Sequence, residues 1–484
     1  MKRSPDRLVL AVLALGAAAS ALIVLLGTSR YGIGLFPDTA VYFAGARSLA
    51  SGLGFASFDG SPVVVFPPLY SILLAPFAGS PASGAIVLNI FLMALAGALS
   101  FGLAHRYTAS LPAAAAIMLL VLLLRPMGDI ASVALSELPF VVVVLVWIWL
   151  ATRYLDAPNG RTLVLLAGVT ALAVLLRYIG VFLVLLGVAL AMLPPKPVRT
   201  RAAHAAAFAV LSALPIAAYL ARNLAVSGTL AGRREPSQTG LLENLSLTLD
   251  AVLGWFWPQI ALDVAPVYWG FAASIAVGLV WLATRTKTSN RDLLVPVAVV
   301  AAYLGLLVYT STTAAFDPIG PRLAAPAYAP FVLIAGALVW RAWPNLGRGG
   351  RGILAVGLAV WLLPALADSG KEILERMRQG AGGYASSSWQ ENGAIRWIRE
   401  SRPDSLVSNA ADAVYLLTDI SAESVPSRGT PKADHWPGGR TRTLVLFDDV
   451  ERPYQLSLDE LRSKADVQLV KTYPGAQVFR VSPR

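Results

Sequence analysis

Long apolar segments recur between residues 8 and 367, and short polar loops separate them. A helix of about 20 apolar residues crosses the roughly 30 Å hydrocarbon layer of a bilayer. The pattern therefore predicts a polytopic α-helical membrane protein. We assign about eleven transmembrane helices, at residues 8–28, 85–104, 108–124, 138–153, 162–176, 178–193, 204–221, 267–283, 293–311, 323–340 and 352–367.

The first apolar segment follows a basic start, which is also typical of a secretory signal peptide. Residues 17–20, AAAS, resemble a small-residue cleavage site, but the apolar run continues through ALIVLLG at 21–27. That run is longer than the hydrophobic part of a usual signal peptide. We therefore expect an uncleaved first span.

One assignment depends on a single arginine. Residues 162–193 form an apolar stretch of 32 residues that is interrupted by RYIG at 177–180. As one helix it would be about 48 Å long at 1.5 Å per residue, too long for a bilayer without steep tilt. Two short spans that turn at Arg177 keep its guanidinium at a membrane surface. At the bilayer centre an arginine costs roughly 2.5–3.5 kcal/mol or more.

The distribution of basic residues supports this split. With eleven spans and Met1 in the cytoplasm, every inner loop carries Arg or Lys at high density, as the positive-inside rule requires. These loops are MKRSPDR, HRY, RYLDAPNGR, PPKPVRTR, TRTKTSNR and RAWPNLGRGGR, and without the split the last two would fall outside. We predict a multi-pass protein of the cytoplasmic membrane, with the N-terminus inside and the C-terminus outside.

Composition excludes several classes of function. Only 14% of the 484 residues are charged, against about a quarter in a soluble domain. The net charge of +11 resides in short loops, where it sets topology and meets anionic lipid head groups, so no nucleic-acid partner is expected. With no cysteine and only three histidines, disulfides, thiolate chemistry and Cys- or His-rich metal sites are excluded.

All long connections fall on the outer side, at residues 29–84, 125–137, 222–266, 312–322 and about 384–484. In the last segment WQENGAIRWIRES and SLDELRSKA have helical patterns, whereas RTLVLFDD and AQVFRVS have strand patterns. We predict a transmembrane module at 1–367 that includes the first outer loop, a linker at 368–388, and a small extracytoplasmic α/β domain at 389–484.

Three acids of the outer segments are candidates for catalysis. Asp38 follows Pro37 at the start of a helical pattern, Glu137 opens the fourth span, and Asp129 lies just before that span. Structural alternatives exist, because Asp38 is well placed to cap its helix and Glu137 to favour a helix N-terminus through the dipole. An outward-facing carboxylate can also deprotonate an acceptor hydroxyl.

The first outer loop is unusually apolar. Tyr42 and Arg47 follow Asp38 on a short amphipathic helix, and Pro67 and Tyr70 lie in the stretch VVVFPPLYSILLAP. A segment this rich in apolar residues, proline and glycine lies in the membrane interface or folds over a cavity. These four side chains are our candidates for a substrate cavity.

Arginines gather at the outer ends of the spans. Arg177 stands at a turn, Arg222, Arg233 and Arg234 share the third outer loop, and Arg322 begins the tenth span. Singly, each suits an interfacial anchor. Together they suit a lipid phosphate, because guanidinium groups bind phosphate in a bidentate manner and such a phosphate lies at this depth. We predict that Arg177, Arg222, Arg233 and Arg322 bind a donor phosphate.

An aromatic run, GWFWPQ at 254–259, lies in the same third outer loop. Tryptophans at this position suit an interfacial belt, which we favour over stacking on a sugar.

These residues together resemble the GT-C superfamily of membrane glycosyltransferases. The similar branch includes protein O-mannosyltransferases, lipid A aminoarabinose transferases and RgtA/B/C/D-like enzymes. The resemblance covers roughly residues 1–340. It rests on the segments PDTAVYFAGARSLASGLGF, FPPLYSILLAP, SELPF, LLRYIG, ARNLAVSGTLAGRR and DPIGPRLAAPAYAP.

The resemblance implies a hexosyl- or pentosyltransferase that uses polyprenyl-phosphate sugars at the outer membrane face. In such enzymes an acid of the first outer loop is the base or orients the acceptor, and Asp38 matches it. The branch often has an acidic pair here, but Thr39 follows Asp38, so Glu137 or Asp129 is the candidate for the second acid. Metal dependence varies across the superfamily. We identify no metal site and expect no required cofactor, and a divalent cation has no support in the sequence.

Two other classes of function remain open. A transporter or flippase for lipid-linked sugars would carry polar residues within its spans, whereas the ionisable residues here lie at span ends. No internal repeat is evident, which also disfavours a transporter built from two related halves. A non-catalytic scaffold would leave the long first outer loop without a purpose. We favour transfer of a sugar to an extracytoplasmic glycolipid, polysaccharide or protein.

Overall fold

The computed structural model describes residues 7–232, 234–256, 265–286 and 290–484. The chain forms two compact units, and each is described by itself. The helical unit comprises Met1–Gly27, Val64–Tyr70 and Ile86–Glu375. The loop–domain unit comprises Thr28–Val63, Ser71–Ala85 and Arg376–Arg484.

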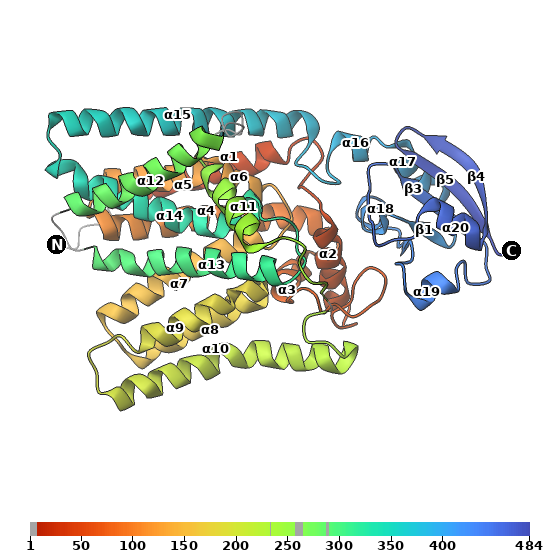
Figure 1. Cartoon of the computed structure of the whole chain (residues 1–484), viewed down its shortest axis with the longest axis horizontal. Helices are drawn as coiled ribbons and strands as arrows, with labels where there is room; N and C mark the ends of the chain where they lie inside the picture. The colour runs from red at the N-terminus through yellow and green to blue at the C-terminus, as the bar shows by residue number, and fades with distance from the viewer. Residues whose placement is uncertain (1–6, 233, 257–264, 287–289) are drawn as a thin grey trace. The chain divides into compact units, whose positions relative to one another are not determined.

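Each of the eleven predicted spans is helical, and the long helices run alongside one another in Figure 1. Among the described residues, seven helices are long and apolar enough to cross a membrane, and the bent pair α5–α6 would make an eighth. Shorter apolar helices cover Gly160–Leu176, Tyr178–Ala191 and Ala273–Arg285. The helices are α1 (Arg7–Gly27), α4 (Pro81–Thr108), α5 (Leu111–Leu123), α6 (Arg125–Ala131), α7 (Glu137–Asp156), α8 (Gly160–Leu176), α9 (Val181–Ala191), α10 (Val198–Ser227), α11 (Leu241–Leu253), α12 (Ala265–Arg285), α13 (Leu294–Thr313), α14 (Pro321–Ala342) and α15 (Arg348–Gln379).

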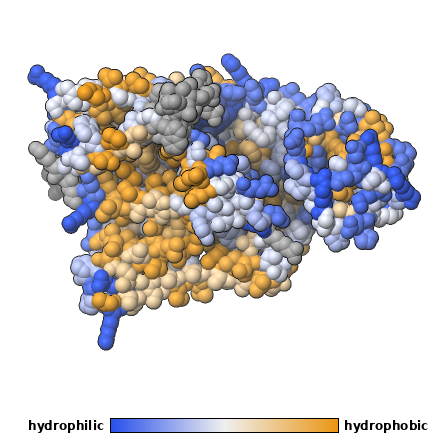
Figure 2. All heavy atoms as spheres, in the orientation of Figure 1, coloured by the Kyte–Doolittle hydropathy of each residue, from blue (hydrophilic) through white to orange (hydrophobic). Residues whose placement is uncertain are grey.

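The surface of the helical unit is apolar. Figure 2 shows hydrophobic side chains over much of its visible face. Large apolar side chains are exposed on consecutive helices, among them Val164, Leu165, Leu185, Val210 and Leu214. A soluble protein rarely exposes so much contiguous apolar surface. The chain is therefore a polytopic helical membrane protein, as the sequence predicts.

The predicted turn at Arg177 is confirmed. Arg177 has extended backbone angles at the end of α8, and a short 3₁₀ turn at Tyr178–Gly180 leads into α9. A Cβ atom on Gly180 would lie 2.6 Å from the carbonyl carbon of Ala173. Only glycine allows the returning chain to approach α8 so closely.

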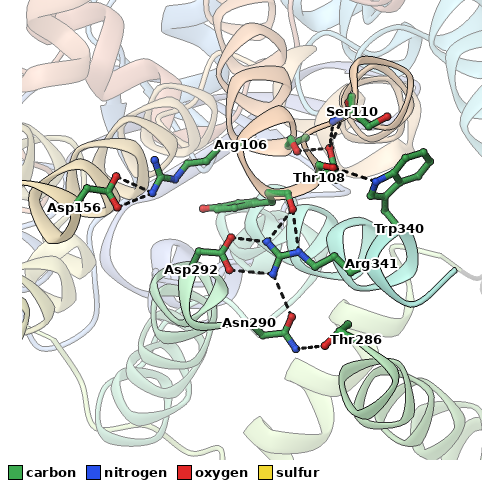
Figure 3. Close-up of polar contacts among 11 residues, drawn as sticks. Arg106, Thr108, Ser110, Asp156, Thr286, Asn290, Asp292, Trp340 and Arg341 are labelled. Atoms are coloured by element: carbon green, nitrogen blue, oxygen red, sulfur yellow. Dashed lines mark hydrogen bonds and ion pairs between the residues drawn. The ribbon is translucent and has the colours of Figure 1, made fainter. Parts of the chain in front are cut away.

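Five of the six loops that carry the predicted inner charges are joined at one end of the helical unit, and Figure 3 shows most of these contacts. Residues 1–6 of the first loop lie outside the described residues. Arg341 donates to the carbonyl of Tyr107 at 2.9 Å and to Asp292 at 3.0 Å, which joins three loops. Arg106 pairs with Asp156 at 2.8 Å. The fifth of these loops is joined by Lys196, which donates to the carbonyl of Pro158 at 2.7 Å. The charge pattern thus grouped these loops correctly.

The C-terminal part of the loop–domain unit is a small α/β fold. Its sheet has the order β2-β1-β3-β5-β4, with β1 parallel to β2 and β3, and β5 antiparallel to β3 and β4. All four elements predicted in this segment are present. The strands are β1 (Leu406–Ser408), β2 (Glu423–Ser424), β3 (Arg442–Phe447), β4 (Asp466–Tyr473) and β5 (Ala476–Ser482), and the helices are α16 (Ser387–Gln390), α17 (Gly393–Ser401), α18 (Ala411–Thr418), α19 (Pro431–Asp434) and α20 (Leu458–Lys464).

The division of the chain differs from the expected one in two places. Residues 368–379, expected within the linker, continue α15 to Gln379, because the residues that follow Gly370, KEILERMRQ, are mostly strong helix formers. Most of the first outer loop, expected within the transmembrane module, joins the C-terminal segment in one unit, as Thr28–Val63 and Ser71–Ala85, whereas Val64–Tyr70 belong to the helical unit. This loop contains α2 (Pro37–Ala50), α3 (Leu69–Leu74) and a 3₁₀ turn at Ala75–Phe77.

Candidate functional site

Asp38 lies in the first turn of α2 and does not cap it. The N-cap residue is Phe36, and Pro37 occupies the first helical position, which suits its fixed φ. The backbone N–H of Phe36 donates to the Thr39 hydroxyl at 3.1 Å. Thr39 thus closes the helix start, and the expected cap role of Asp38 is wrong. The half-buried carboxylate is still favoured there by the helix dipole.

The two cavity candidates on α2 lie on different faces of the helix. At about 100° per residue, Tyr42 shares the face of Asp38, whereas Arg47 lies on the opposite face. Tyr42 is buried. Arg47 pairs with Asp419 at 2.8 Å and donates to the Tyr415 hydroxyl at 2.9 Å. Its guanidinium is therefore engaged by the C-terminal domain.

Glu137, Arg177 and Arg322 form one cluster in the helical unit. The Glu137 side chain is only 1% exposed, and its Oε1 lies 2.8 Å from Nη1 of Arg177 and 3.4 Å from Nη1 of Arg322. Arg322 also pairs with the exposed Asp317 at 2.9 Å. Three predicted site residues from three different helix ends therefore meet on a single carboxylate.

A second group of residues holds part of the first outer loop within the same unit. Tyr178 and Tyr219 each donate a hydrogen bond of 2.9 Å to the backbone carbonyls of Val64 and Phe66, respectively. Asn223, which is fully buried, donates to the Tyr178 hydroxyl at 3.3 Å. Pro67 is buried and follows this clamped backbone directly. Tyr70, a further cavity candidate, is also buried.

Further arginines surround this group. The guanidinium of Arg222 lies over the Tyr219 ring at 5.9 Å and that of Arg234 over the Phe316 ring at 4.3 Å. Both lie within electrostatic range of Tyr178, the residue after Arg177. We call Arg177, Arg222, Arg234 and Arg322 the arginine cluster.

Asp129 belongs to a different polar group. It pairs with Arg125 at 3.4 Å, and the same guanidinium contacts Asp368 at 3.2 Å and Glu372 at 3.0 Å. Three carboxylates thus surround one arginine at the bend between α5 and α6. No grouping of three or more His, Asp or Glu side chains suited to a metal ion occurs in the described parts of the chain.

The candidate residues from the sequence overlap these groups only in part. Arg233 and the end of the predicted aromatic belt, from residue 257, lie outside the described residues. Asn223 and Asp317 were missed, because a buried amide and a loop acid carry no signal in the sequence alone. Arg234 directly follows Arg233, which was predicted to bind phosphate, so the sequence indicated the right segment of the loop.

Comparison with solved structures identifies the fold of the chain. A crystal structure of ArnT from Cupriavidus metallidurans bound to undecaprenyl phosphate matches with a TM-score of 0.62 and 13% identity, over 99% of this chain and 98% of that one. The apo form of that protein matches with the same score and identity, over 98% and 97%. The chain has a GT-C fold.

A larger protein shares this fold in part. Arabinofuranosyltransferase AftD from Mycobacteria matches with a TM-score of 0.51 and 15% identity, over 98% of this chain and 41% of that one. No family model and no curated protein matches the sequence. The GT-C fold predicted from the sequence segments is therefore confirmed by structural likeness.

Proposed function

We propose that this protein is a glycosyltransferase that moves a hexose or pentose from a polyprenyl-phosphate donor to an extracytoplasmic acceptor, such as a glycolipid, a polysaccharide or a protein. The observation that carries the proposal is the arginine cluster, in which two guanidinium groups from separate helix ends share Glu137. Guanidinium groups held by a shared buried partner are preorganised for a phosphate. The ArnT structure that contains undecaprenyl phosphate has the same fold.

In the proposed reaction Asp38 is the general base. The acceptor hydroxyl loses its proton to the Asp38 carboxylate while its oxygen attacks the anomeric carbon of the sugar. The bond between that carbon and the phosphate oxygen breaks, and its electron pair leaves with the polyprenyl phosphate. The arginine cluster stabilises the negative charge that develops on the departing phosphate. The sugar is transferred with inversion.

The contacts of the other two candidate acids suggest different roles for them. Glu137 is buried and its Oε1 is engaged by two arginines, so it is not available to an acceptor hydroxyl. We assign it the task of orienting Arg177 and Arg322. Asp129 is paired with Arg125, and we assign it a structural role.

The buried polar side chains within the long helices favour an enzyme over a flippase. Ser20, Thr152, Thr170 and Ser212 each donate to a carbonyl four residues earlier in their own helix. Such local bonds satisfy each hydroxyl within its helix. These side chains do not form the continuous polar path that transport of a sugar head group requires.

The test is a transfer assay with purified protein, a polyprenyl-phosphate sugar and an acceptor extract. We expect Asp38→Asn to lower kcat by a factor of about 10²–10⁴, the usual contribution of a positioned base. Asp59→Asn is the matched control, because Asp59 lies in the same loop, is exposed and accepts hydrogen bonds from the backbone and hydroxyl of its neighbour Ser61. Full activity of a folded Asp38→Asn variant would refute the catalytic role.

A further inference from the structure

The helix that carries Asp38 is attached to the C-terminal domain along one face. Ala40, Ala44 and Arg47 fall on this face at helical spacing, and Asp38 lies roughly 160° away from Ala40 around the axis. Ala40 and Ala44 form an apolar cluster with Tyr415 of α18, and Phe58 and Leu416 pack against it. The helix therefore rests on α18 and presents Asp38 on its other side.

Arg47 fixes the C-terminal end of α2 to the same element. Its guanidinium donates to the Tyr415 hydroxyl at 2.9 Å, pairs with Asp419 at 2.8 Å, and donates to the carbonyl of Ala78 at 3.4 Å. The guanidinium also lies over the Tyr415 ring, with its central carbon 5.5 Å from the ring centroid. Burial raises the pKa of the Tyr415 phenol, so the hydroxyl stays neutral and accepts this hydrogen bond across the physiological range.

The loop after α2 reinforces this contact. The Phe58 ring stacks on Tyr415 with 5.3 Å between the ring centroids. The Ser421 hydroxyl donates to the carbonyl of Phe58 at 3.0 Å. One aromatic residue of the domain, Tyr415, thus contacts both α2 and the loop that follows it.

The N-terminal end of α2 is fixed by backbone pairing. Leu35 forms a parallel bridge with Gly383, and the N–H of Tyr384 donates to the carbonyl of Leu35 at 2.7 Å. Gly383 has a φ of +57°, a region that favours glycine. Tyr384 is held in turn by Asp412, the second residue of α18, through a hydrogen bond of 2.7 Å. Both ends of α2 are therefore linked to α18, one directly through Arg47 and the other through Tyr384.

We propose that α18 is the support that sets the orientation of the catalytic helix, with Arg47 as a positioning residue. This inference rests on the proposed function, because it assigns Arg47 an effect through Asp38. The two residues are nine positions apart, about 13 Å along the axis. A helix of this length transmits a tilt at one end to the other, and a misplacement of about 1 Å can lower a rate 10²-fold.

The variants Arg47→Ala, Asp419→Ala and the double variant test the proposal in a transfer assay. We expect each to lower kcat about 10- to 100-fold, with the KM for the donor changed less than threefold. The double variant should be no slower than the slower single variant, because both remove one contact. Arg47→Lys should recover part of the loss by restoring the ion pair. Arg428→Ala, which breaks an exposed pair with Glu460 in the same unit, is the matched control and should keep wild-type kcat.

Hydrogen exchange provides a readout that does not depend on the assigned chemistry. The amides of α2 should exchange at least tenfold faster in Arg47→Ala than in wild type, and those of the long helices should be unchanged. Faster exchange of α2 with a wild-type kcat would overturn the proposal, as would independent, multiplying effects of the two substitutions. If Asp38→Asn retains transfer while Arg47→Ala loses it, the role of Asp38 fails, and the positioning role through Asp38 fails with it.

Discussion

The two ends of helix α14 each carry an arginine, and the two arginines differ in every respect that matters for function. Arg341 lies in the last turn, where a cation is favoured by the helix dipole. Its side chain is 10% exposed and bound by Asp292 and the carbonyl of Tyr107. Arg322 lies in the first turn, where the dipole disfavours a cation. It is 32% exposed and shares the carboxylate of Glu137 with Arg177.

The difference in burial and in position on the helix indicates which of the two arginines is suited to bind a ligand. The guanidinium of Arg341 is largely buried and bonded to the Asp292 carboxylate and the Tyr107 carbonyl, which links three loops. Its role is therefore structural. Arg322 stands against the helix dipole in a group of four arginines. Natural proteins break such local rules mainly at functional sites. The dipole at that helix end would favour an anionic ligand beside Arg322.

The largest effect on stability should come from Glu137→Ala, which leaves Arg177 and Arg322 without their common carboxylate. Breaking a buried ion pair costs about 3–5 kcal/mol. We expect the lower end, about 3 kcal/mol, because the two arginine side chains are 20% and 32% exposed and can reach solvent. Denaturant unfolding in detergent measures it. Asp156→Ala, which breaks an exposed pair with Arg106, is the control and should cost less than about 1 kcal/mol. Equal stability of the two variants would contradict the comparison.

Arg341→Gln should lower stability without a specific effect on the ligand. The variant loses an ion pair and two hydrogen bonds to a carbonyl, for which we expect about 2 kcal/mol. The folded fraction should bind undecaprenyl phosphate as wild type does. Weaker binding at unchanged stability would show that the two ends of α14 are functionally alike.

The smallest effect concerns an exposed pair of the loop–domain unit. The Arg428 guanidinium and the N–H of Ser457 lower the pKa of Glu460 from 4.5 to about 2. The stabilisation is fully present above pH 4.5 and is lost as the pH falls towards 2. Glu460→Gln should therefore flatten the pH dependence of unfolding within this window and leave it unchanged above. An unchanged acid limb would mean that this pair contributes nothing.

Features set by local sequence could be predicted. Apolar length gave the helices, the arginine at position 177 gave the turn, and the capping pattern at Ser457 and Glu460 gave α20, where both bonds of the capping box are present. The distribution of basic residues predicted which loops lie together at one end of the helical unit. Each of these signals acts within a few residues, so no tertiary information was needed.

Features that depend on distant contacts could not be predicted. The hydrogen bond between Arg47 and Tyr415 joins residues 368 positions apart, and it turns a candidate cavity residue into part of a domain contact. The helix start at Phe36 was missed because Asp38 matched the usual capping pattern, while Thr39 fills that role in three dimensions. The sharing of Glu137 by two arginines required the packing of the ends of α7, α8 and α14.

The most direct test is the affinity of purified protein for undecaprenyl phosphate, compared among wild type, Arg322→Gln and Arg106→Gln. Arg106 is the matched control, because it is an arginine in an exposed ion pair at the other end of the helical unit. We predict that Arg322→Gln weakens binding about 10- to 100-fold, the loss of one or two charge-assisted hydrogen bonds, and that Arg106→Gln binds as wild type does. Wild-type affinity of a folded Arg322→Gln variant, or equal weakening by both substitutions, would contradict the account.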